Sequence, residues 1–189
     1  GGLYKSTDRG TTWTTIDSGI AVVNGRPDMG TVRGFYLDPR SCAAPPPSGP
    51  CPAGGGALQK ILAVGSGIVD ASAPGLPYRS ARVYRSTNAG ATWAASESGL
   101  PLPQSIGGGV LAYTGGIAAI VADPGSPNTV YIGSFLTYPF GAPGITTPTL
   151  PNGVFKSLDG GATWTHSSNG LPRIGGAGTS HLDVLALAI

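Results

Sequence analysis

Few side chains in this chain of 189 residues could carry out chemistry. Asp and Glu together number 9, and there are 2 His residues. Hydrolysis of a glycosidic bond needs two carboxyl groups about 5–9.5 Å apart, facing one sugar. Asp28 and Asp70 are the weak candidates for such a catalytic pair, because both fall in loops that we expect on one face of the molecule. Nothing in their spacing marks them as partners.

Other kinds of chemistry leave no pattern in the sequence. His166 and His181 have no Cys or second His at ligand spacing, so no metal site and no cofactor is predicted. We find no phosphate-binding glycine loop and no nucleophile elbow. The net charge of +2 is small and its basic residues are scattered, which argues against nucleic acid or an anionic membrane as partner. No apolar run approaches the roughly 18 residues of a membrane span.

The elements that must position these side chains are announced by a repeat. The stretches "YKSTDRGTTW" (4–13), "YRSTNAGATW" (84–93) and "FKSLDGGATW" (155–164) share one pattern. Each is followed, six residues after its Trp, by Gly and then Ile or Leu. Alternating side chains on both sides of Asp-x-Gly or Asn-x-Gly are typical of two strands and a tight turn. Each copy is therefore predicted to form a β-hairpin.

Two further strand signals lie between the copies. "GFYLDPRS" (34–41) and "AIVADPGS" (119–126) are apolar runs ending in Asp-Pro, and each is followed by "ILAVGS" (61–66) or "VYIGS" (130–134). With the hairpin, this gives four strands per unit. The 32 Gly and 18 Pro fit many short strands joined by turns. The sequence thus predicts an all-β fold, a β-propeller segment of four-stranded antiparallel blades.

The predicted divisions of the chain follow from this order. Residues 1–20 would form the outer hairpin of a first partial blade, and 31–100 a second blade with loop insertions. Residues 116–171 would form a third blade with a loop insertion, and 182–189 the inner strand of a fourth partial blade. A closed propeller needs about 4–8 blades. We therefore expect a segment of a larger propeller, partnered by the remaining blades or by neighbouring protein subunits. The alternative is a complete small domain closed by self-association.

The repeated motif resembles the Asp-box, or BNR repeat, of sialidases, xyloglucanases, sortilin-like receptors and photosystem II assembly factors. The first and third copies keep every position, and the second has Asn88 in place of Asp. The resemblance implies that the motif residues are structural: the acid or amide caps the turn, Gly relaxes the backbone, and Trp is buried between units. These residues are Ser6, Asp8, Gly10, Thr12, Trp13, Ser86, Asn88, Gly90, Thr92, Trp93, Ser157, Asp159, Gly161, Thr163 and Trp164.

The two cysteines lie close together in "CAAPPPSGPC". Cys42 and Cys51 are predicted to form a disulfide that staples this loop, the alternative being two exposed free thiols. A disulfide indicates an oxidising compartment, so the expected location is extracytoplasmic: secreted, periplasmic or cell-surface.

Propeller topology sorts the loops onto two faces. The hairpin turns and the cysteine loop would share one face, and the long insertions, 67–81 and 135–152, would lie on the other, where ligand sites usually lie in this architecture. Aromatic side chains there could stack on sugars or anchor a protein partner, or equally pack their own loops. The candidates on this ligand or partner face are Arg26, Tyr78, Arg79, Tyr113, Phe135, Tyr138, Phe140, Arg173 and His181.

Two functions are compatible with this pattern. The first is a non-catalytic extracytoplasmic recognition or scaffold module, with carbohydrate as one candidate ligand. The second is a fragment of a secreted glycoside hydrolase, sialidase- or xyloglucanase-like. Sialidase chemistry, by resemblance, would need an arginine triad and an Arg-Ile-Pro signature, and "LPRIGG" (171–176) does not match that signature.

Overall fold

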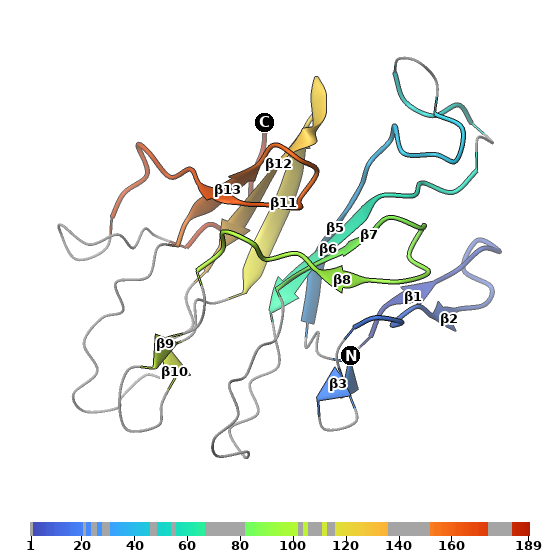
Figure 1. The fold of residues 1–189 in the computed structure, drawn as a ribbon, viewed down its shortest axis with the longest axis horizontal. Helices are drawn as coiled ribbons and strands as arrows, with labels where there is room; N and C mark the ends of the chain where they lie inside the picture. Colours follow the sequence, from blue (N-terminus) through green and yellow to red (C-terminus); the bar gives the residue numbers. More distant parts are fainter. Residues whose placement is uncertain are drawn as a thin grey trace.

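The structure is a computed structural model, and it describes residues 2–20, 22–23, 26–27, 31–45, 49–53, 56–66, 82–101, 104–105, 111–112, 116–135, 152–173 and 183–189. These residues form strands, turns and extended segments, with no helix among them (Figure 1). Accordingly, an apolar helix long enough to cross a membrane is absent from the described residues.

One four-stranded antiparallel sheet is built from the middle of the chain. It has the order β5-β6-β7-β8. The ladder pairs Tyr36 with Leu62, Leu62 with Arg85, and Arg85 with Ala94. The strands are β5 (Thr31–Leu37), β6 (Ile61–Ser66), β7 (Val83–Ser86) and β8 (Ala94–Ala95).

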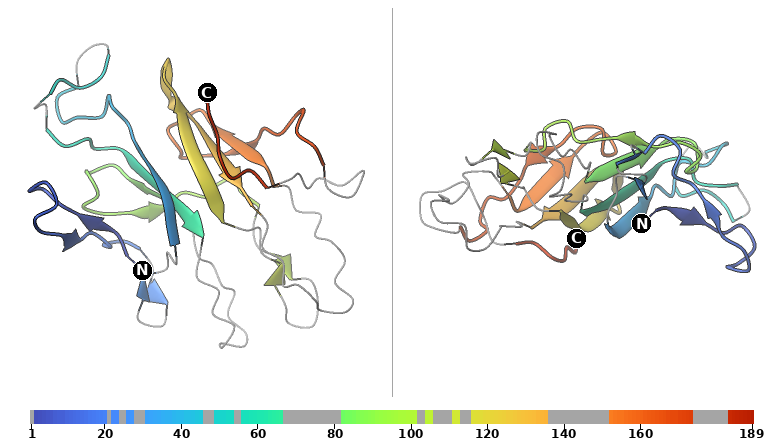
Figure 2. Two further views of the ribbon diagram at one scale, coloured as in Figure 1. Left: turned by 180° about the vertical axis from the view of Figure 1, so that it is seen from behind. Right: turned by 90° about the horizontal axis from the view of Figure 1, so that it is seen from below.

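A second sheet repeats the same order with later residues. It runs β11-β12-β13-β14, again antiparallel, and its outer ladder pairs Ile132 with Phe155 and Phe155 with His166. The strands are β11 (Ile117–Asp123), β12 (Ser126–Ser134), β13 (Val154–Ser157) and β14 (Thr165–His166). The two sheets lie side by side, with β5 next to β11 (Figures 1 and 2). Two equivalent sheets packed in this way are blades of a β-propeller, so the predicted fold class is confirmed.

Shorter pieces flank the two blades. Hairpin β1 (Tyr4–Lys5)–β2 (Thr14–Thr15) has the register of β7–β8 and β13–β14. Two small hairpins that the sequence did not predict are β3 (Val22–Val23)–β4 (Arg26–Pro27) and β9 (Gln104–Ser105)–β10 (Leu111–Ala112). Residues 183–189, expected to be an inner strand, form no strand, although the Val184 N–H donates to the Ser134 carbonyl at 3.0 Å.

The apolar core fills both faces of β6. Leu62 and Val64 belong to one buried cluster, which continues into the second blade through Ile132 and Trp164. Ala63, which points to the other face, belongs to a second cluster with Trp93. A strand covered on both faces needs a continuous apolar run, which is what "ILAV" (61–64) supplies. Each large side chain buried here contributes about 1.5–3 kcal/mol to folding.

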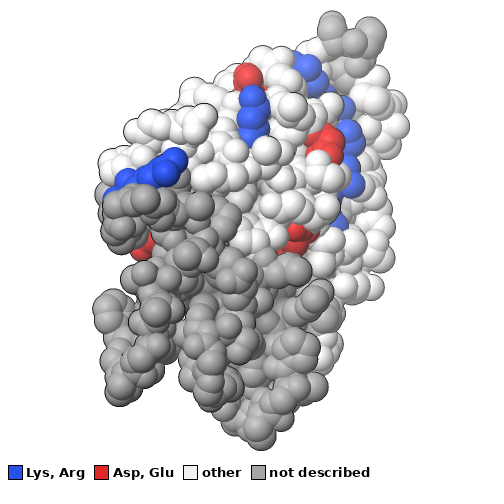
Figure 3. All heavy atoms as spheres, turned by 60° about the vertical axis from the view of Figure 1, so that its left-hand side comes forward, with Lys and Arg blue, Asp and Glu red and all other residues white. Residues whose placement is uncertain are grey.

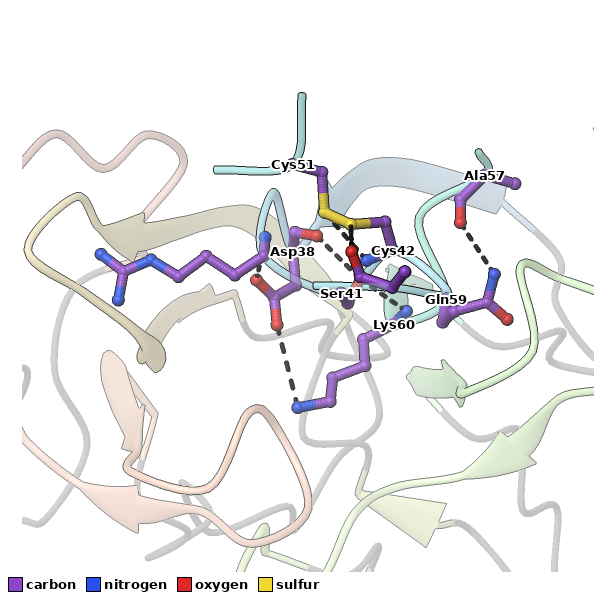
Figure 4. Close-up of a disulfide and its surroundings, with 9 residues drawn as sticks. Asp38, Ser41, Cys42, Cys51, Ala57, Gln59 and Lys60 are labelled. Atoms are coloured by element: carbon purple, nitrogen blue, oxygen red, sulfur yellow. Dashed lines mark hydrogen bonds and ion pairs between the residues drawn. A yellow bond between two sulfur atoms is a disulfide. The ribbon is translucent and has the colours of Figure 1, made fainter. Parts of the chain in front are cut away.

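The predicted disulfide is present in the loop between β5 and β6. Cys42 and Cys51 are bonded, with their Cα atoms 6.0 Å apart. Next to the disulfide, the Lys60 ammonium lies 3.9 Å from the Asp38 carboxylate (Figure 4). This loop lies at the end of the blades opposite hairpins β3–β4 and β9–β10 (Figure 1).

Candidate functional site

The Ser-x-Asp turns of the three hairpins share one network of hydrogen bonds. In the third copy, Ser157 Oγ accepts the N–H of Gly161 at 2.8 Å and donates to Asp159 Oδ1 at 2.7 Å. The equivalent distances are 2.7 and 2.8 Å for Ser6 with Gly10 and Asp8, and 2.9 and 2.9 Å for Ser86 with Gly90 and Asn88. The serine hydroxyl therefore satisfies a turn N–H that the hairpin itself leaves unpaired.

The acid or amide completes the turn from the other side. Asp159 Oδ1 accepts the N–H of Thr163 at 2.9 Å, and Oδ2 accepts the Thr163 hydroxyl at 2.6 Å. In the second copy the amide reverses the last bond, because Asn88 Nδ2 donates to Thr92 Oγ1 at 2.8 Å. Asn88 Oδ1 still accepts the Thr92 N–H at 2.9 Å. The amide is thus an adequate substitute for the carboxylate in this turn.

These hydrogen bonds also fix the charge of the two turn aspartates. Bonds from the hydroxyl and the N–H of Thr12, and from Ser6, lower the pKa of Asp8 to about 2. Partial burial raises the pKa of Asp159, but the bonds from Thr163 and Ser157 outweigh it and bring the value down to about 2. A general acid at neutral pH needs a raised pKa. Neither aspartate is suited to proton transfer.

Two carboxylates that the sequence left unassigned turn out to hold the blades together. Leu3 donates its N–H to Asp17 Oδ1 at 2.6 Å, and Arg82 donates its N–H to Glu97 Oε1 at 2.7 Å. In the third copy, Ser168 plays the same part by accepting the Val154 N–H at 2.9 Å. The signal was available, because all three acceptors stand four residues after the repeated Trp. The Arg82 guanidinium adds a 3.0 Å ion pair to Glu97.

Each buried tryptophan docks on the turn that follows the tryptophan of the preceding copy. The Trp164 N–H donates to the Ser98 carbonyl at 2.8 Å, and the Trp93 N–H donates to the Ser18 carbonyl at 2.8 Å. Trp93 and Trp164 are 4% and 3% exposed, but Trp13 is 63% exposed. The expectation that all three are buried is therefore wrong for Trp13. The reason is that no described copy precedes the first hairpin and supplies a turn to cover it.

The other described carboxylates likewise serve the backbone. Asp38 Oδ1 accepts the N–H of Arg40 at 2.9 Å, and Asp123 Oδ1 accepts that of Gly125 at 2.8 Å. Asp183 is exposed. The catalytic candidates Asp28 and Asp70 both lie outside the described residues, so their pairing stays a prediction. The described residues hold no cluster of three His, Cys, Asp or Glu side chains able to bind a metal ion.

Two described residues of the predicted ligand face have side chains that can be placed. Phe135 is half-buried, and the Arg33 guanidinium of β5 lies 4.9 Å from its ring centroid. This cation–π contact attaches the base of the loop to the sheet. Arg173 is exposed, and Arg26 is paired in the ladder with Val23. The remaining candidates lie outside the described residues and stay predictions: Tyr78, Arg79, Tyr113, Tyr138, Phe140 and His181.

A small cleft lies between the two blades, on the side of the disulfide. Its walls include Tyr36, Lys60, Arg85 and Pro127, and it has room for about one water molecule. Burial, with the nearby Asp38 charge, raises the pKa of Tyr36 to about 12, and its hydroxyl donates to the Pro127 carbonyl at 3.1 Å. This cleft is a joint between blades and is too small for a sugar.

Charged side chains are few on the described surface. Figure 3 shows isolated basic and acidic groups separated by wide uncharged areas, with positive and negative groups interspersed. A surface of this kind offers no concentrated field to attract a polyanion.

Comparison with known proteins places the chain beside large propeller enzymes at low similarity. No protein-family model matches it, and neither does any curated protein. A GH74 enzyme of Niastella koreensis is 21% identical, with a TM-score of 0.34 over 95% of this chain and 30% of that one. A GH74 xyloglucanase from Xanthomonas campestris is 18% identical, with a TM-score of 0.33 over 92% of this chain and 28% of that one. The chain thus spans less than a third of the solved structures it matches. Such low scores carry no conclusion about its activity.

Proposed function

We propose that this chain is a non-catalytic recognition or scaffold module, part of a larger Asp-box β-propeller protein or complex that works outside the cytoplasm. One observation carries the proposal. The carboxylates that accept a backbone N–H hydrogen bond are Asp8, Asp17, Asp38, Asp123, Asp159 and Glu97. A carboxylate that caps backbone groups cannot also face a sugar as nucleophile or acid.

The electrostatics support the same conclusion. Glycoside hydrolysis needs one carboxyl group whose pKa is raised, so that it keeps its proton for the leaving group. The described aspartates with resolved shifts, Asp8 and Asp159, are shifted in the opposite direction, to about 2. Both are ionised at any pH at which such an enzyme works.

Recognition is assigned to the face that carries the long insertions. Arg33 and Phe135 show that an aromatic ring at the start of one insertion is attached to the rigid sheet, since the guanidinium lies 4.9 Å from the ring. Rigid aromatic side chains suit both sugar stacking and protein recognition. The ligand class proposed is therefore a carbohydrate or a neighbouring protein surface.

Hydrolysis assays test the absence of catalysis. The intact protein is incubated with sialosides and β-glucans, and we expect no release of sugar. If sugar is released, Asp28→Asn and Asp70→Asn are compared with the control Asp183→Asn, an exposed carboxylate. Release that survives in the control and disappears in either other variant overturns the proposal in favour of a secreted glycoside hydrolase.

Thiol chemistry tests the proposed location. Protein from its native host is alkylated without reductant, and we expect Cys42 and Cys51 to react only after reduction. Two reactive thiols in the untreated protein would contradict the extracytoplasmic assignment, because the disulfide is the feature that supports it.

A further inference from the structure

We infer that the exposed Trp13 hairpin is one half of a head-to-tail interface. Its other half is the turn after Trp164 on a second copy of this chain. The inference rests on the proposed scaffold role, since it names the surface through which units would join. The argument starts from two contacts of the same kind inside the chain.

The contact between the two complete blades shows the geometry in full. Trp164 donates its backbone N–H to the Ser98 carbonyl at 2.8 Å and its indole Nε1–H to the Ser96 carbonyl at 2.9 Å. Ser96 Oγ donates back to the Gly161 carbonyl at 2.5 Å. Leu100, at the end of the same turn, is buried in the cluster that contains Trp164.

The contact between the first hairpin and the first complete blade repeats this arrangement. The Trp93 N–H donates to the Ser18 carbonyl at 2.8 Å, and Ile20 is buried beside the indole. Lys5 Nζ adds a 3.0 Å bond to the Ala89 carbonyl in the neighbouring turn. The same docking thus occurs twice, between different pairs of units.

A glycine at the centre of each docking turn lets the backbones touch. A Cβ on Gly99 would lie 2.0 Å from the Trp164 carbonyl oxygen, and one on Gly19 would lie 2.2 Å from that of Trp93. The third turn has the same shape, since φ is +87° at Gly170 against +86° at Gly99. No described atom lies within 4 Å of a Cβ built on Gly170. This turn is built for docking but is uncovered in the single chain.

The complementary half is equally complete. The Trp13 hairpin pairs Tyr4 with Thr15, as β7 pairs Tyr84 with Ala95. Its Ser-x-Asp turn makes the same bonds as the other two, so the indole stands on a preformed support. An exposed tryptophan on a rigid hairpin is the kind of side chain that contributes most to interfaces.

The occupant is a second copy because one chain carries both halves at opposite edges. Hairpin β1–β2 and strand β13 lie at the two sides of the molecule in both face-on views (Figures 1 and 2). A contact between two different surfaces is heterologous, and it builds a ring or an open chain. In this contact Trp13 Nε1–H would donate to the Ser167 carbonyl and the Trp13 N–H to the Asn169 carbonyl. Ser167 stands where Ser96 stands in the preceding copy.

Sedimentation velocity across micromolar to millimolar concentrations tests the interface. We expect the 189-residue chain to associate increasingly with concentration. Trp13→Ala removes one half and Gly170→Ala blocks the other, so each variant alone stays monomeric. An equimolar mixture of the two variants restores one intact interface, because each supplies the half that the other lacks. The mixture is expected to form a 1:1 heterodimer.

The matched control is Gly56→Ala, which also has a positive φ, +89°, and no described atom within 4 Å of its Cβ position. It should associate like the unchanged chain, and circular dichroism shows whether each variant is folded. A wild-type chain that stays monomeric, a Gly170→Ala variant that associates normally, or a mixture without heterodimer each overturns the inference. Sugar release in the hydrolysis assay would instead overturn the proposed function and leave this interface unaffected.

Discussion

Trp93 and Trp164 are buried, whereas Trp13, in a hairpin of the same register and the same turn bonds, is exposed. The difference does not come from the motif, since Ser, Asp, Gly and Thr make equivalent hydrogen bonds in the first and third copies. It comes from the neighbour. Trp93 and Trp164 each meet a glycine turn of the preceding unit, and Trp13 meets none among the described residues. The motif builds the hairpin by itself, while burial of its tryptophan needs a second unit.

The largest effect should separate the two kinds of tryptophan. Trp164→Ala is expected to lower the free energy of unfolding by about 3–5 kcal/mol, because it leaves a cavity in the contact between blades. Trp13→Ala should change it by no more than about 0.5 kcal/mol, as is usual for exposed positions. Urea unfolding of the dilute chain, followed by circular dichroism, measures both. Equal losses would show that the single chain does not expose Trp13.

The glycines of the docking turns give a second contrast. Gly99→Ala should cost about 2–4 kcal/mol, since strain at positive φ adds to overlap with the Trp164 carbonyl. Gly170→Ala should cost only the strain at positive φ, about 1–2 kcal/mol. The same unfolding experiment compares them. A cost for Gly170→Ala as large as that for Gly99→Ala would mean that the third turn is already covered.

The serines of the turns differ less. Ser157→Ala leaves the Gly161 N–H without its acceptor at a buried site, and we expect a loss of about 1–3 kcal/mol. Ser6→Ala removes the same bond at an exposed site, where water replaces the hydroxyl, so the loss should stay below about 1 kcal/mol. Chemical denaturation at neutral pH decides between them, and a larger loss for Ser6→Ala would contradict the explanation by burial.

The smallest effect concerns pH. The pKa of Asp159 is lowered from 3.8 to about 2 in the fold, so its ionised form stabilises the turn above pH 3.8. That contribution is lost as the pH falls through about 2. Asp159→Asn should therefore weaken the acid dependence of the unfolding free energy, and Asn88→Asp should strengthen it. Thermal unfolding from neutral to acid pH measures both slopes, and an unchanged slope in both variants would refute the assignment.

The local elements were predictable because their interactions are short in sequence. Ser157 reaches Asp159 and Gly161 within four residues, and Cys42 reaches Cys51 within ten. Spacing therefore sufficed to predict the hairpin turns, the disulfide and the order of four strands in each blade. The ligand face was predicted from the same topology, but most of its candidates lie outside the described residues and stay predictions.

The sequence by itself determined the repeat, and with it the register of every hairpin, because a turn satisfies its hydrogen bonds from within. Only the tertiary structure decided what those hairpins contact. Asp17 accepts from Leu3 and Glu97 accepts from Arg82 across fourteen and fifteen residues, and Trp164 bonds to Ser96 across sixty-eight. Partners so far apart are set by how the blades pack. Three tryptophans with one motif can therefore have two environments, two inside a contact between units and one at an open edge.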